Sequence, residues 1–151
     1  MVLYPYMAKN KNIKLFKKLF VGLTMFNTLN VSIFFALSGV LIYYFYNTTS
    51  LEIVNVTKIL TIEAYATVPA ILIGFPLLGI LISNKEVIKT TIIGSVFYIC
   101  SVLLMYCFGY VNIYTIAIFT VITEYFILIQ RIYKLYINKK LTPFCVDKTT
   151  P

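Results

Sequence analysis

The chain has 151 residues, of which 60% are hydrophobic and 12% are charged, and its net charge is +8. A soluble domain carries about 25% charged residues, so this composition leaves too little polar surface to cover a soluble globule. We therefore predict an integral membrane protein. The positive charge does not indicate nucleic acid as a partner, because the lysines stand beside apolar stretches, as they do at membrane flanks.

The sequence shows no sign of an enzyme, a cofactor or a metal site. It has no His, and its three Cys form no Cys-x-x-Cys motif, whereas zinc prefers Cys and His ligands. We recognise no nucleophile beside a base and no phosphate-binding loop. We accordingly expect no catalytic residues and no cofactor.

The first 25 residues are not a typical secretory signal peptide, because their basic run follows the short apolar stretch at residues 2–7 instead of preceding it. Residues 1–7 resemble the end of a helix. Residues 8–20 place apolar side chains at helical spacing among lysines. They are either an amphipathic segment lying in the membrane interface or a basic cytoplasmic loop, and the two interpretations are compatible.

Four apolar stretches follow, each close to the roughly 20 residues that a helix needs to cross a bilayer. The expected fold is all-α, with transmembrane helices at residues 26–46, 59–82, 90–108 and 113–133. Asn27, Asn30 and Ser32 near the start of the first stretch should face other helices, since polar groups are costly against lipid. We expect residues 136–151 to form a basic, disordered cytoplasmic tail.

The second apolar stretch contains Pro69 and Pro76. Proline removes a backbone donor and clashes with the preceding turn, so we predict a kinked helix. Ala66, Ala70 and Gly74 recur every four residues and form a stripe of small side chains. Such a stripe allows two membrane helices to approach closely.

The connections and the charges predict the orientation. We expect a polar loop at residues 47–57 and a tight turn at 109–112, where Gly109 and Asn112 supply the turn chemistry. With four spans, the basic segment before the first span, residues 83–89 and the C-terminal flank share one side, and the other side has only Lys58. The positive side faces the cytoplasm, so both termini should be cytoplasmic.

Glu124 is the sharpest local feature, because it stands near the middle of the last apolar stretch. An ionised carboxylate there costs several kcal/mol, roughly, unless it is paired, solvated or protonated. Glu124 is therefore either a coupling group or part of a substrate path, or else a structural side chain hydrogen-bonded with help from Thr120 or Thr123. Glu63, nearer the membrane surface, is a weaker candidate for the same roles. A cationic run follows the stretch, comprising Arg131, Lys134, Lys139 and Lys140.

Four segments, taken in order, resemble a known family. They are VLYPYMAKNKN at 2–12, NVTKILTIEAYATVPAILIGFPLLGILI at 55–82, NKEVIKTTIIGSVFYI at 84–99 and FGYVNIYTIAIFTVITEYFILIQRIYKL at 108–135. They are similar to the C-terminal third of the Wzx-type O-antigen and capsular-polysaccharide flippases, which belong to the multidrug/oligosaccharidyl-lipid/polysaccharide exporter superfamily. Glu124 matches the glutamate of that family's closing helix.

The resemblance implies the flipping of an undecaprenyl-diphosphate-linked oligosaccharide across the bacterial inner membrane by alternating access. Such transporters have about a dozen spans in two lobes and hold substrate between them. The chain would then be the end of one lobe, a truncated C-terminal fragment whose partner is the missing N-terminal part. The cations that hold the diphosphate would lie in that missing part.

Two other functions are compatible with the sequence. One is a self-contained four-helix exporter that couples transport to protons through Glu124, although such exporters usually carry the essential carboxylate in the first helix. The other is a structural membrane subunit without transport. In all three cases membrane lipid is the surrounding partner.

Overall fold

The structure, a computed structural model, describes residues 13–47, 50–79 and 82–137. These residues form an all-α fold, as predicted. Its elements are α2 (Ile13–Tyr46), α3 (Leu51–Leu72), the π-helix η1 (Ile73–Leu78), α5 (Asn84–Cys107) and α6 (Ile113–Ile137). The features expected at residues 1–12 and 138–151, including Lys139 and Lys140, lie outside the described residues.

Four continuous helical stretches are long and apolar enough to cross a membrane by length and composition. They are Leu15–Tyr46, Leu51–Leu78, Asn84–Cys107 and Ile113–Ile137. Most of their large apolar side chains are exposed on the isolated chain, which suits a surface surrounded by lipid. These properties place the chain in the class of multi-pass membrane proteins.

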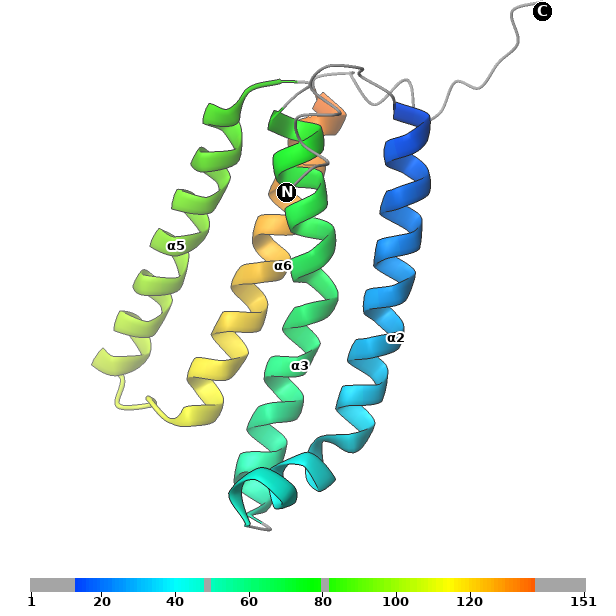
Figure 1. The fold of residues 1–151 in the computed structure, drawn as a ribbon. Helices are drawn as coiled ribbons and strands as arrows, with labels where there is room; N and C mark the ends of the chain where they lie inside the picture. The colour runs from blue at the N-terminus through cyan, green and yellow to red at the C-terminus, as the bar shows by residue number, and fades with distance from the viewer. Residues whose placement is uncertain (1–12, 48–49, 80–81, 138–151) are drawn as a thin grey trace, which may run out of the picture.

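The helices stand in an open row in the order α2, α3, α6, α5 (Figure 1). The last helix, α6, thus lies between α3 and α5, and α3 lies between α2 and α6. The same end of the row along the helix axes, the upper end in Figure 1, holds the start of α2, the start of α5 and the end of α6. Each inner helix therefore has two helical neighbours, and each outer helix has one main neighbour.

Three helices begin earlier than the expected spans, and one of them is α5, which starts at Asn84 where a span from residue 90 was predicted. The helix α2 starts at Ile13, so the basic segment before residue 26 is continuous with the first apolar stretch. The expected loop at 47–57 is shorter than predicted, because α3 starts at Leu51. No proline or glycine interrupts its first turns, and Glu52 in the first turn complements the positive end of the helix dipole.

The two turns at the ends of α5 have the expected chemistry. Ser83 caps α5 by accepting a hydrogen bond from the Lys85 backbone N–H at 3.2 Å. Gly109 has a φ of 73°, a left-handed conformation that suits glycine. Asn112 Oδ1 accepts the Thr115 backbone N–H at 2.8 Å and so caps α6. The predicted roles of Gly109 and Asn112 are confirmed.

The polar side chains of α2 divide into two groups. Asn27 donates to the Ala64 carbonyl at 2.8 Å, and the Ser32 hydroxyl lies 2.8 Å from the Tyr65 hydroxyl, so both contact α3 as predicted. Asn30 is exposed and donates to the Phe26 carbonyl of its own helix. Asn30 nevertheless lines an open pocket between α2 and α3 together with Thr57 and Thr61, so it faces α3 as predicted.

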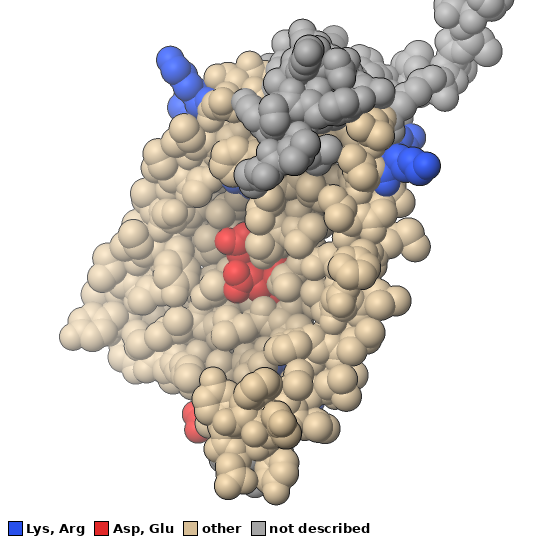
Figure 2. Space-filling model, viewed as in Figure 1, with Lys and Arg blue, Asp and Glu red and all other residues tan. Residues whose placement is uncertain are grey.

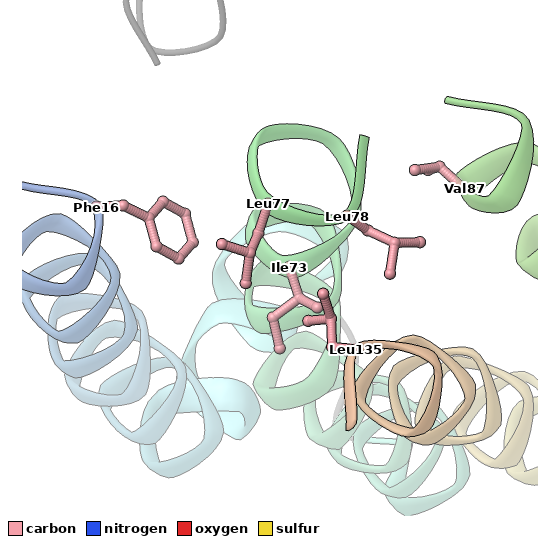
Figure 3. Packing of buried hydrophobic residues seen from close by; sticks show 6 residues of the cluster. All are labelled: Phe16, Ile73, Leu77, Leu78, Val87 and Leu135. Atoms are coloured by element: carbon pink, nitrogen blue, oxygen red, sulfur yellow. The ribbon is translucent and has the colours of Figure 1, made fainter. Parts of the chain in front are cut away.

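A compact apolar cluster forms around η1 (Figure 3). Its centre is Ile73, Leu77 and Leu78 of η1, against which Phe16 of α2, Val87 of α5 and Leu135 of α6 pack. These three partners come from three different helices, so η1 is the point where all four helical stretches meet. The cluster lies near the end of the row at which α2 and α5 begin.

Candidate functional site

The most deeply buried charge among the described residues belongs to Arg131 of α6, whose side chain is only 5% exposed. Its Nη1 donates to the Ala70 carbonyl of α3 at 2.7 Å. Its Nη2 donates to Thr91 Oγ1 at 3.0 Å, and its Nε donates to Thr90 Oγ1 at 3.3 Å. One side chain therefore connects α6 with both α3 and α5.

The two threonines are suited to accept from a cation. The hydroxyls of Thr90 and Thr91 both donate to the Val87 carbonyl, at 2.7 and 3.1 Å. Their protons are thus directed at their own helix, and their lone pairs remain available to Arg131. A guanidinium has five N–H donors and no acceptor, so it is satisfied only by such oxygen atoms.

Gly74 provides the space in which the guanidinium lies. A Cβ on Gly74 would stand 2.8 Å from Arg131 Nη1 and 2.9 Å from Arg131 Cζ, closer than real Cβ contacts. Ala66 and Ala70 of the same predicted stripe are also buried, at 0% and 1% exposure. The stripe therefore lies inside the row of helices, and its last member is in contact with Arg131.

The burial of Arg131 corrects the interpretation of the sequence, which grouped this residue with the cationic run after the span. The helix α6 continues to Ile137, and Arg131 lies on its buried face with Thr123, Ile127 and Leu135. These four residues recur every four positions, which is the signal that could have indicated burial. The acceptors could not be predicted, because they stand 40 to 61 positions away in the sequence.

Glu63 of α3 and Glu124 of α6 lie close enough to repel each other electrostatically. The two helices are held together at this level by Tyr125, whose hydroxyl donates to the Ile62 carbonyl at 3.4 Å. Figure 2 shows acidic side chains in the middle of an otherwise apolar face. The structure thus brings together the two carboxylates that the sequence suggested separately.

Neither carboxylate is neutralised by a cation within the described part of the chain, where the ion pairs involve only Glu86 with Lys89 and Lys134. The help expected from neighbouring threonines is also lacking. Thr120 donates to the Ile116 carbonyl at 2.9 Å, and Thr123 donates to the Phe119 carbonyl at 2.7 Å. Glu124 is therefore not held by these hydroxyls, and the structural interpretation that invoked them is not supported.

The two prolines lie on either side of the start of η1. Pro69 is inside α3, and Pro76 is inside the π-helix Ile73–Leu78. A π turn inside an α-helix is rare and is frequently found at functional sites. The irregular section of the second apolar stretch is therefore this π turn, which lies beside Arg131, and the kink at the two prolines stays a prediction.

Most of the described cations gather at one end of the row (Figure 2). Lys17 and Lys18 lie near the start of α2, Lys85 and Lys89 near the start of α5, and Lys134 near the end of α6, where it pairs with Glu86. Lys58 lies near the other end, in α3, with its Nζ 5.7 Å from the centre of the Phe35 ring.

Comparison of the chain with known protein families, with curated proteins and with solved structures finds no match. The described residues also contain no group of three side chains able to hold a metal ion.

Proposed function

We propose that this multi-pass membrane protein is a helical unit of a transporter that moves lipid-linked oligosaccharides across the bacterial inner membrane. The observation that carries the proposal is the meeting of Glu124 and Glu63 in the middle of the apolar helices. Ionisable groups at such depth are costly and tend to serve transport or proton relay. The resemblance of the sequence to polysaccharide flippases supplies the substrate class, an undecaprenyl-diphosphate-linked oligosaccharide.

The charges suggest that ion coupling and substrate binding are carried out by different residues. The substrate diphosphate is anionic and is repelled by two carboxylates, so Glu63 and Glu124 would couple movement to an ion and would not hold the substrate. Anion-binding cations would come from a second lobe that packs beside the open row. With the basic end in the cytoplasm, the start of α2 and the end of α6 would both be cytoplasmic.

Translocation in inverted inner-membrane vesicles tests this function. The vesicles would come from a bacterial strain that lacks its own flippase and expresses this chain together with the N-terminal lobe of a polysaccharide flippase. Entry of the labelled lipid-linked oligosaccharide would be followed by its protection from a glycosidase. We expect protection with the wild type and a loss with Glu124→Gln. Glu52→Gln, at the first turn of α3, is the matched control and should retain the activity.

Vesicles in which the wild type gives no more protection than the strain without the chain would contradict the proposal. So would equal protection with the wild type and with Glu124→Gln, because the carboxylate would then have no part in transport.

A second candidate function is the proton-coupled export of small cations. It is favoured by the same two carboxylates, since a site with two acidic groups that form no ion pair among the described residues suits a cationic substrate or a proton. Acidification of the vesicle lumen, followed by addition of a lipophilic cation, would release protons in this case. Glu63→Gln and Glu124→Gln should both abolish the release, whereas oligosaccharide protection would not be observed.

A further inference from the structure

We propose that the helical stretch formed by α3 and η1 contains a hinge. The side chain of Arg131 holds this hinge in one conformation through its hydrogen bonds, and we call it the latch. In the latched state shown by the structure, the guanidinium holds the end of α3 against α5 and α6. Release of the guanidinium would allow α3 to move relative to η1. This inference concerns the conformational mechanics of the chain and does not depend on which substrate is transported.

The hinge is the π turn Ile73–Leu78. Pro69 precedes it and Pro76 lies within it, and neither residue has a backbone N–H to donate to the preceding turn. The Ile73 N–H is shared between the carbonyls of Pro69 and Ala70, whereas the Gly79 N–H donates to the Gly74 carbonyl five residues before it, so the hydrogen-bond ladder leaves the α-helical register within η1. A π turn with two prolines is therefore the weakest section of this long helical stretch.

The latch acts on the residue just before the change of register. Arg131 Nη1 donates to the Ala70 carbonyl at 2.7 Å and so supplies a charged donor where the helical ladder is irregular. The same guanidinium donates to Thr90 and Thr91 of α5. Because α5 and α6 also contribute Val87 and Leu135 to the cluster around η1, the latch fixes α3 to the part of the chain that holds η1.

Movement at the hinge would be transmitted to the carboxylates. Glu63 lies about two helical turns before Ala70 on α3, whereas Glu124 is carried by α6. A rotation of α3 about the π turn therefore changes the separation of Glu63 and Glu124. The glycine at position 74 is required for the latched state, because a Cβ there would displace the guanidinium.

Backbone hydrogen exchange of the full chain in lipid nanodiscs tests the latch. We expect Arg131→Gln to accelerate exchange of the amides at residues 70–79 by about tenfold or more, since hydrogen bonds from a charged donor are lost. Exchange in residues 25–40 of α2 should change less than about twofold. Thr91→Val, which removes one acceptor without changing the shape of the side chain, should produce a smaller acceleration confined to the same amides.

Three further comparisons make the test decisive. Thr91→Ser keeps the hydroxyl and should exchange like the wild type. Gly74→Ala should reproduce the acceleration seen with Arg131→Gln, whereas Gly22→Ala, where nothing lies within 4 Å of an added Cβ, should not. If Arg131→Gln does not fold, the comparison of Thr91→Val with Thr91→Ser shows whether the hydrogen bond to Arg131 slows exchange at residues 70–79. Unchanged exchange at residues 70–79 in Thr91→Val and Gly74→Ala, or an equal acceleration in all helices, would overturn the latch.

Discussion

At the scale of single residues, the fold treats the buried cation Arg131 and the two half-buried carboxylates differently. Arg131 has acceptors for three of its donors, all within 3.3 Å. Glu63 and Glu124 repel each other and have no cation paired with them among the described residues. Sites that sacrifice stability in this way are commonly sites of function. Arg131 therefore stabilises the fold, whereas the repulsion between the two carboxylates destabilises it.

This contrast predicts that neutralising a carboxylate stabilises the protein. Glu124→Gln or Glu63→Gln should raise the Tm in detergent by about 2–4 °C, because each removes a charge–charge repulsion from an apolar region. Thermal unfolding monitored by circular dichroism would measure the shift.

Glu52→Gln provides the control for this prediction. Glu52 is exposed in the first turn of α3, where its charge complements the helix dipole, so its neutralisation should leave the Tm unchanged or lower it slightly. A Tm that falls with Glu124→Gln and with Glu63→Gln would show that the two carboxylates hold the fold together.

At the scale of the helices, α5 and α6 approach each other closely at Gly94. A Cβ on this buried glycine would lie 2.6 Å from Ile127 Cδ1 and 3.8 Å from Thr123 Cγ2. We predict that Gly94→Ala destabilises the protein by about 1–3 kcal/mol, because Ile127 must leave its position or the helices must separate. The denaturant midpoint in mixed micelles would measure the loss, and Gly22→Ala, with open space around the added methyl, should show none.

The cap of α6 gives a second prediction at this scale. Asn112 Oδ1 accepts hydrogen bonds from the backbone N–H and the hydroxyl of Thr115, at 2.8 and 2.9 Å. Asn112→Ala should cost about 1 kcal/mol, the usual loss for an N-cap, and Asn112→Ser should recover most of it. Equal stability of Asn112→Ala and the wild type would show that the cap contributes nothing.

The sequence was sufficient to predict the helices but not their internal details. Runs of apolar residues between polar turns predicted the four helical stretches, and Gly109 and Asn112 predicted the turn before α6. Pro69 and Pro76 indicated an irregular helix, but not that the irregularity is a π turn. That geometry depends on partners from other helices, namely Arg131 and the apolar cluster, which a local pattern does not contain.

At the scale of the whole molecule, the order α2, α3, α6, α5 leaves the row of helices open. A closed four-helix bundle would bury one face of every helix around a shared axis, whereas here α2 and α5 lie on opposite sides of the inner pair. This order could not be predicted from local patterns, because it follows from long-range contacts such as that of Arg131 with Ala70. An open row is the shape expected of a unit that packs against further helices.

We propose that the protein has four spans and that its cation-rich end faces the cytoplasm. Single cysteines at Ser50, Ser83 and Asn112, in a chain in which Cys100, Cys107 and Cys145 are replaced by Ser, would test it with a membrane-impermeant maleimide on bacterial spheroplasts. The account predicts that positions 50 and 112 are labelled on intact spheroplasts and that position 83 is labelled only after permeabilisation. Labelling of position 83 on intact spheroplasts, or different behaviour of positions 50 and 112, would contradict it.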